Sequence, residues 1–361
     1  MEKQNRAMEL YRFVCSVMIL CYHCYFFAFR DVEGSEVFVG FYLFVELFFI
    51  LSGFLMLHSV RTRLTQTQRL NAADTTAKYM KRRLAALYPH HLLSFALVAA
   101  IELFLTRQLK VLDLFRVGWA EVLLVNAFGF VRDAYINIVC WYLSVLVFSS
   151  ILIYYLLVRH EDVFLKVLAP VLLVFLYGTI FDRKGSLANT IVFTQHAPFM
   201  GFYRGFADMT VGCLAYRVYE WMKDVKIPGE WLLATILELA VMIASALWMY
   251  GHWGKLDFLF VPLFFAFVIS VFRGKSLFTR LFDNGLSAWL GHISYAYFLN
   301  NLVVIYPFMY FFPNAGIWGM ALVCVPACLI VSILTTALVD GLTGHRRWGM
   351  SSSDQLKAGG L

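Results

Sequence analysis

Three ionisable residues, Arg12, His23 and Glu46, lie in or beside the first two apolar segments of the chain. Ionisable side chains are costly inside a membrane span, so each one is a candidate functional residue. His23 follows Arg12 by eleven residues. At 100° per residue, this spacing returns a helix to within about 20° of the same face, about 16 Å further along its axis. The spacing therefore predicts that Arg12 and His23 share one stripe of a helix.

Glu46 adds a carboxylate at a depth similar to that of His23. In antiparallel neighbouring helices, Glu46 would lie about eight residues from the outer end of its helix, and His23 about six residues from the outer end of the first helix. A carboxylate beside an imidazole fixes its tautomer and raises its basicity, as a general base requires. We therefore predict a His23–Glu46 pair with His23 as the base. Simpler interpretations stay open: Arg12 snorkels to the interface, His23 forms a hydrogen bond across helices, and Glu46 offsets a buried charge.

The segment Arg61–Arg83 holds seven basic residues and one acid, Asp74. Such a segment can bind anionic lipid, or it can hold the phosphates of a small molecule. Arg82 and Arg83 lie close to the start of the third apolar run, ahead of Pro89. That position suits a phosphorylated donor whose tail enters the helix bundle.

Other conspicuous patterns have structural explanations. The run Cys21-Tyr22-His23-Cys24 resembles a metal or redox motif, but no second ligand pair accompanies it, so we predict no metal site. The seven cysteines lie in apolar segments and do not suggest a disulfide framework. Ser52-Gly53 lacks the strand–turn–helix context of a nucleophilic serine and instead predicts close helix packing.

The elements that must position these residues are membrane helices. Of 361 residues, 61% are apolar and only 15% are charged, a balance that argues against a soluble domain. We predict an all-α polytopic bundle of about ten transmembrane helices, with one membrane domain over residues 1–345 and a short polar cytoplasmic tail over 346–361. The ten apolar runs are Phe13–Phe29, Phe38–Leu57, Leu92–Leu105, Trp141–Val158, Val167–Phe181, Phe206–Trp221, Trp231–Tyr250, Phe258–Phe272, Trp289–Phe312 and Ile317–Val339.

The distribution of Lys and Arg predicts the orientation. With the N-terminus inside and ten crossings, 21 of the 30 basic residues lie in inside segments, Arg204 being counted among those outside. The positive-inside rule therefore favours cytoplasmic N- and C-termini. Val117–Val131 is apolar but short, and we interpret it as an interfacial or re-entrant helix on the outer side. The expected location is the cytoplasmic membrane, with membrane lipid as a partner and no nucleic acid.

The chain resembles the acyltransferase-3 family of multi-pass membrane O-acyltransferases in motifs that span nearly its whole length. The matching motifs are Arg12-(ten residues)-His23, Val45-Glu46-Leu47-Phe48-Phe49-Ile50-Leu51-Ser52-Gly53-Phe54, Lys81-Arg82-Arg83 with Leu87-Tyr88-Pro89, Trp141-Tyr142-Leu143-Ser144, Arg204 to Gly212, and Gly291-His292-Ile293-Ser294-Tyr295 with Tyr297-Phe298-Leu299.

The resemblance implies transfer of an acyl group, often acetyl, from cytoplasmic acetyl-CoA or another acyl-CoA to a hydroxyl of a cell-envelope or secreted glycan. It implies that His23 is the catalytic base and Arg12 its essential partner. Arg83 matches the first arginine of the family's Arg-x-x-Arg pair, which is associated with donor binding.

Three positions depart from the family pattern. Ala86 stands where the second arginine is expected, and Lys81 and Arg82 are the candidates to compensate for it. Leu146 replaces a frequent glutamate and Asn301 a frequent histidine. A transporter is the alternative function, because it would also explain intramembrane His and Glu residues. However, the internal repeats and matching broken helices that transporters often show are not evident in the sequence.

Overall fold

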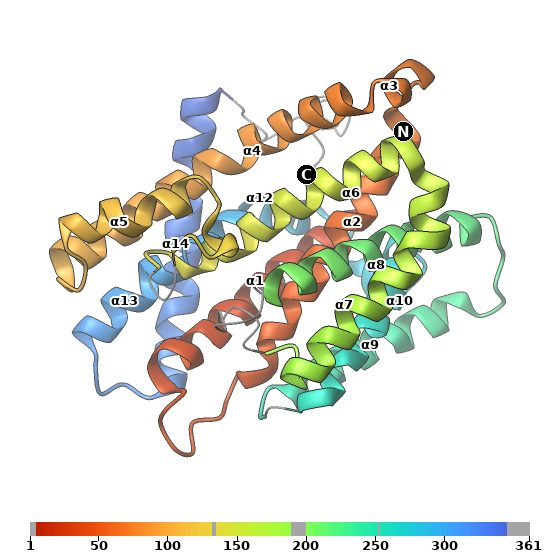
Figure 1. The fold of residues 1–361 in the computed structure, drawn as a ribbon. Coiled ribbons are helices and arrows are strands. Elements are labelled where there is room, and N and C mark those ends of the chain that lie inside the picture. Colours follow the sequence, from red (N-terminus) through yellow and green to blue (C-terminus); the bar gives the residue numbers. More distant parts are fainter. Residues whose placement is uncertain (1–4, 132–134, 189–199, 252, 345–361) are drawn as a thin grey trace.

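The computed structural model describes residues 5–131, 135–188, 200–251 and 253–344, and these residues form helices and no strands. This confirms the all-α class. The predicted tail over 346–361 lies outside the described residues. The helices are α1 (Arg6–Cys24), α2 (Phe44–Arg63), α3 (Gln66–Leu70), α4 (Ala72–Ala100), α5 (Val111–Val122), α6 (Trp141–Val163), α7 (Ala169–Lys184), α8 (Met200–Met222), α9 (Glu230–Trp248), α10 (Phe260–Arg273), α11 (Leu277–Phe282), α12 (Gly285–Leu299), α13 (Asn301–Phe311) and α14 (Ile317–Thr343) (Figure 1).

Short turns of other helix types extend several of these helices. Tyr25–Phe29, Ile101–Leu105 and Phe164–Leu168 continue α1, α4 and α6 as π-helical turns, and Val39–Leu43 and Gly254–Leu259 lead into α2 and α10 as 3-10 turns. Among the residues that the structure describes, seven helical segments are long and apolar enough to cross a membrane: Arg6–Phe29, Val39–Arg63, Ala72–Leu105, Ile138–Lys184, Glu230–Trp248, Gly254–Arg273 and Ile317–Thr343.

The segment Ile138–Lys184 is too long for one crossing. Its 47 residues would extend about 70 Å as a straight helix, more than twice the thickness of the hydrocarbon layer. The helix breaks at His160, whose φ of −138° and ψ of 44° are not helical. Figure 1 shows the chain turning there, so that α7 runs back along the bundle. The segment therefore contains the two separate apolar runs that the sequence predicted.

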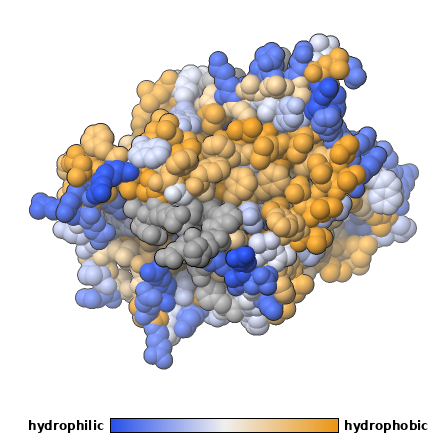
Figure 2. All heavy atoms as spheres, viewed as in Figure 1, coloured by the Kyte–Doolittle hydropathy of each residue, from blue (hydrophilic) through white to orange (hydrophobic). Residues whose placement is uncertain are grey.

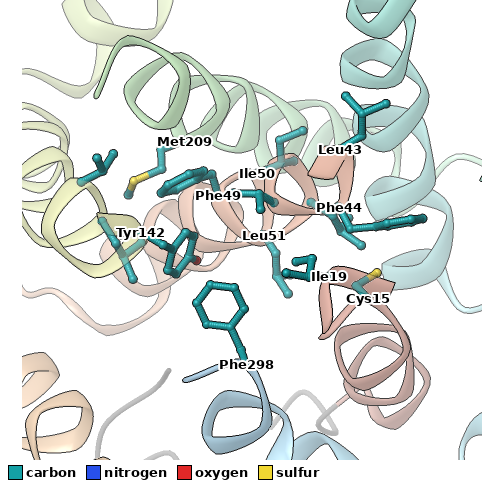
Figure 3. Close-up of a cluster of buried hydrophobic side chains, with 14 of the residues drawn as sticks. Cys15, Ile19, Leu43, Phe44, Phe49, Ile50, Leu51, Tyr142, Met209 and Phe298 are labelled. Atoms are coloured by element: carbon teal, nitrogen blue, oxygen red, sulfur yellow. The ribbon is translucent and has the colours of Figure 1, made fainter. Parts of the chain in front are cut away.

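Helix α2 lies at the centre of the bundle. In its most apolar stretch 83% of residues are buried, whereas the corresponding value for α9 is 22%. Figure 3 shows its side chains Phe49, Ile50 and Leu51 among residues from other helices, with Tyr142 of α6 and Phe298 of α12 close by. A central α2 brings Glu46 into contact with the interior of the bundle and not with lipid.

Two glycines bring α2 and α8 into backbone contact. A methyl group added at Gly53 would lie 1.9 Å from the carbonyl oxygen of Met209, and one at Gly212 would lie 1.9 Å from that of Ile50. The Cys213 thiol also donates to the Gly53 carbonyl at 3.4 Å. Only glycine allows this approach, which confirms the prediction that Ser52-Gly53 marks close helix packing.

The outer helices expose apolar side chains, as expected for surfaces in contact with lipid. Figure 2 shows a broad hydrophobic area across this face, with hydrophilic residues gathered at its margins. Large exposed side chains include Leu233 and Ile236 of α9 and Leu322 and Leu342 of α14. In water such surfaces would drive aggregation, so this pattern is that of a membrane protein.

Three boundaries differ from the predicted ones because apolar runs reveal only the apolar parts of helices. α4 begins at Ala72, so much of the expected basic loop Arg61–Arg83 is helix. α8 begins at Met200 and contains Arg204, which is 3% exposed and not an outer-loop residue. α5 covers Val111–Val122, earlier than the apolar run Val117–Val131.

Candidate active site

His23 is buried near the end of α1, and its ring contacts an amide from the far end of the chain. The amide nitrogen of Asn301 lies 2.9 Å from His23 Nδ1. Within the part of the chain that the structure describes, this is the hydrogen bond found for the His23 ring. The imidazole is therefore anchored through one nitrogen, and the other nitrogen is the one left for chemistry.

Arg12 lies on the same helix, at the same end as Glu9, with which it forms an ion pair of 2.9 Å. The opposing helix α12 approaches this pair through Gly291, where an added methyl group would lie 2.3 Å from the Glu9 side chain. Ser16, one turn further along α1, donates to the Ser294 carbonyl of α12 at 3.1 Å. Arg12 thus belongs to the α1–α12 contact. The rise of a helix separates it from His23 by about 16 Å, as the shared stripe predicted.

The predicted pairing of Glu46 with His23 is wrong. Both carboxylate oxygens of Glu46 accept from Arg204 of α8, with Nε to Oε1 at 2.6 Å and Nη2 to Oε2. Arg204 Nη2 also donates to the Tyr42 carbonyl at 2.8 Å. A bidentate guanidinium satisfies a buried carboxylate better than one imidazole nitrogen does, which explains the partner found. The alternative that Glu46 offsets a buried charge is the one the structure supports.

A second carboxylate extends this buried polar region. Asp208 follows Arg204 by one helical turn and is fully buried, and its Oδ1 accepts from the Tyr177 hydroxyl at 2.5 Å. Nearby, Asp257 accepts from the Tyr42 hydroxyl at 2.6 Å and from Ser186 at 2.6 Å. These contacts tie α2, α7, α8 and the turn before α10 together. Across the described ranges no group of three or more His, Cys, Asp or Glu side chains is arranged to hold a metal ion.

A cavity of about 150 Å³ opens at the other end of α2, beside the start of α4. Four of the residues that line it are basic: Arg63, Lys78, Arg82 and Arg83. Arg83 Nη1 donates to the Tyr79 hydroxyl, while its buried Nε has no hydrogen-bond partner among the residues that the structure describes. The remaining lining residues are Ser59, Leu64, Gln68, Thr75, Tyr79, Ala86 and Tyr154, so no carboxylate neutralises the wall.

The cavity wall is one face of helix α4. Thr75, Lys78, Tyr79, Arg82 and Arg83 recur at the three- and four-residue spacing of a helical stripe, and Ala86 continues it. Lys81 falls between these positions, is exposed and does not line the cavity, so its part in donor binding stays a prediction. Lys78 lines the cavity together with Arg82 and Arg83.

Two other basic residues of the segment are already neutralised by acids from distant helices. Arg61 contacts Glu161 of α6 at 2.5 Å and also pairs with Glu220 of α8, and Arg69 contacts Glu161 at 3.2 Å. Glu161 follows the break at His160, which turns this end of α6 toward α3. These ion pairs hold α3 against the bundle. The stripe on α4 is then the remaining cationic surface of the segment.

Sequence reasoning missed Asn301, Arg204, Lys78 and Glu161 as parts of these sites. The helical periodicity of Lys78, Arg82 and Arg83 was a usable signal once α4 was extended toward Ala72. No local pattern identifies Asn301 or Glu161, because each meets its partner across a long stretch of chain.

A comparison with known protein families shows which family the chain belongs to. The model of the acyltransferase 3 family, described as an acyltransferase domain, matches residues 5–339. The chain belongs to the acyltransferase 3 family. The match contains α1 through most of α14, so every residue of the two sites lies within it. Comparisons with curated proteins and with solved structures give no match.

Proposed function

We propose that this acyltransferase 3 family protein is a membrane O-acyltransferase that uses cytoplasmic acyl-CoA, in the simplest case acetyl-CoA, as its donor. The acceptor is a hydroxyl of a cell-envelope or secreted glycan. The observation that carries this proposal is the cavity beside α4, which has four basic lining residues and no acidic one. Several arginine and lysine side chains around one cavity can bind phosphate groups.

The size of the cavity determines which part of the donor it would hold. A volume of about 150 Å³ is well below the roughly 300–1,000 Å³ of pockets that enclose whole drug-sized ligands. We therefore assign the phosphate end of the coenzyme to the cavity, with the thioester arm directed into the bundle toward α1. Ala86 leaves room at this wall where relatives carry a second arginine.

His23 is proposed as the general base. Nε2 would take the proton of the attacking hydroxyl while its oxygen bonds to the thioester carbonyl carbon. The carbon–sulfur bond then breaks, and the coenzyme leaves as a thiol after it gains a proton. A base held in this way contributes typically about 10²–10⁴-fold to the rate. Glu46 and Arg204 support the helices around the site, and Arg12 supports the α1–α12 contact.

We also propose ten crossings of the cytoplasmic membrane with both termini inside. The turn after His160 supports the count, because it divides one long apolar segment into two. This topology assigns the α4 cavity to the cytoplasmic side, where acyl-CoA is available.

The proposal is tested in membranes supplied with labelled acetyl-CoA and the native glycan. We expect label in the glycan with the wild-type protein and none above background with His23→Ala at equal protein abundance. Movement of glycan across the membrane without label transfer would support the transporter alternative. Transfer by His23→Ala at the wild-type rate would refute the assignment of the base.

A further inference from the structure

Asn301 lies beside His23, at the break between α12 and α13. Asn300, the residue between the two helices, has φ −84° and ψ 7°, and the carbonyl of Leu299 precedes it. That carbonyl accepts from Ser94 at 2.7 Å and from Asn137 at 3.3 Å. The break is therefore fixed by side chains of other segments, and Asn301, which is 0% exposed, is held rigidly at the start of α13.

The amide of Asn301 has two orientations that select opposite tautomers of His23. Rotation by 180° about its terminal torsion exchanges Oδ1 and Nδ2 without moving any other atom. When Nδ2 faces the imidazole, Nδ1 accepts and the ring proton sits on Nε2. When Oδ1 faces it, Nδ1 donates and Nε2 carries the lone pair that a base needs.

Cys328 of α14 favours the second orientation. As the amide is placed, its nitrogen faces His23, and the Cys328 sulfur lies 3.4 Å from the Tyr297 carbonyl oxygen, 3.9 Å from Asn301 Oδ1 and 3.9 Å from the Ser332 hydroxyl. A thiol has one hydrogen, and the shorter contact to a carbonyl oxygen uses it. The sulfur then presents only lone pairs to Asn301, so the amide NH₂ belongs on that side and Oδ1 belongs against His23.

We infer that Asn301 is a positioning residue whose Oδ1 accepts the Nδ1 proton of His23 and so leaves Nε2 unprotonated toward the reacting hydroxyl. The inference rests on the proposed function, in which His23 is the base. Asn301 thereby does what the sequence had assigned to Glu46, and it stands where many family members carry histidine.

Two substitutions separate the hydrogen bond from packing. Asn301→Leu keeps the volume and removes the acceptor, and we expect kcat to fall by about 10²–10⁴-fold with the KM for acetyl-CoA unchanged. Asn301→Asp retains an acceptor and offers no donor, so we expect kcat within about tenfold of wild type. Asn300→Leu is the matched control. Its amide donates to Thr335 at 2.9 Å at the same break and does not touch His23, so the folded variant should keep wild-type kcat.

The outcomes distinguish this inference from the proposed function. If Asn301→Leu transfers acyl groups within threefold of wild type while His23→Ala is inactive, Asn301 has no positioning role but His23 remains the base. If folded Asn301→Asp is as inactive as Asn301→Leu, the acceptor role is wrong. Wild-type acyl transfer by His23→Ala would refute both the assignment of His23 as the base and the positioning role of Asn301.

A spectroscopic test does not depend on activity. Purified protein carrying ¹⁵N-histidine, with His23→Gln to assign the signal, reports which ring nitrogen is protonated. We expect an unprotonated Nε2 and a protonated Nδ1 for His23 in the wild type. The reverse pattern would overturn the inference.

Discussion

The Glu46–Arg204 pair places two opposite charges in a part of the bundle that excludes water. The Glu46 side chain is 0% exposed and that of Arg204 is 4% exposed. Each charge is tolerated because the other satisfies it, since removing one partner leaves an uncompensated buried charge. The effect of a substitution at either position therefore depends on the residue at the other.

Glu46→Gln should lower the stability of the folded protein by about 3–5 kcal/mol, because Arg204 stays charged and buried. The double variant Glu46→Leu/Arg204→Leu should recover most of this loss, because neither charge remains. Thermal unfolding in detergent, with size-exclusion chromatography to count folded protein, measures both. A double variant no more stable than Glu46→Gln would show that the pair does not act as a unit.

Arg83 belongs to the cavity wall, and its replacement should weaken binding of the acyl-CoA donor. Charge-assisted contacts to phosphate contribute about 1.5–3 kcal/mol each, so Arg83→Ala should raise the apparent KM for acetyl-CoA by about ten- to a hundredfold. Lys81→Ala is the matched control, because Lys81 lies on the same helix and is exposed outside the cavity. An equal apparent KM for acetyl-CoA in the two variants would show that the coenzyme binds at another surface.

The residues that could be predicted are those whose own segment is unusual. A histidine and a glutamate in apolar runs stand out because burial of such groups is costly. Their partners could not be predicted, because Glu46 meets Arg204 and His23 meets Asn301 across most of the chain. Single-sequence reasoning gives the depth of a residue along its helix but not the neighbour that its face meets.

At the scale of elements, the bundle depends on how closely α2 and α8 approach. A methyl group at Gly53 or Gly212 would lie within 2 Å of a backbone oxygen, so the helices would have to separate. Separation would also pull the Arg204 guanidinium away from the Glu46 carboxylate, because these residues lie on the same two helices.

Gly53→Ala should therefore destabilise the protein by about 1–3 kcal/mol or more. Gly178→Ala is the control. Gly178 lies within α7, and nothing lies within 4 Å of the added methyl group. Because alanine favours a helix over glycine, that variant should be neutral or stabilised by about 0.5–1 kcal/mol. Comparable melting temperatures for the two variants would contradict the tight α2–α8 contact.

The extents of the helices were predictable only where their composition is apolar. The polar turns at the start of α4 line the cavity, and those at the start of α8 contain Arg204, which pairs with Glu46. Neither feature is visible in a hydropathy pattern. The residue at the break between α12 and α13 is Asn300, and not the proline or glycine that most often interrupts a helix.

At the scale of the whole molecule, the proposed topology requires the end of α4 and the loop after α8 to lie on opposite sides of the membrane. Gln108 and Lys226 are exposed at these two places. The seven cysteines are all buried and free, so a cysteine-free background is the starting point for labelling.

Gln108→Cys should react with a membrane-impermeant thiol reagent added to intact cells, and Lys226→Cys should react only after the membrane is opened. The expected difference follows from the excess of Lys and Arg in the segments assigned to the inside. Labelling of Gln108→Cys only from the cytoplasmic side would refute the ten-crossing arrangement.

The Glu46–Arg204 pair also governs the order in which the chain can assemble during synthesis. The two residues are 158 positions apart, so at about 5–20 residues per second Glu46 leaves the ribosome roughly 8–30 s before its partner. During that interval α2 carries a carboxylate that lipid disfavours, and α8 later brings a guanidinium that lipid disfavours as well. The ion pair at the centre of the finished bundle can therefore form only after α8 has been made.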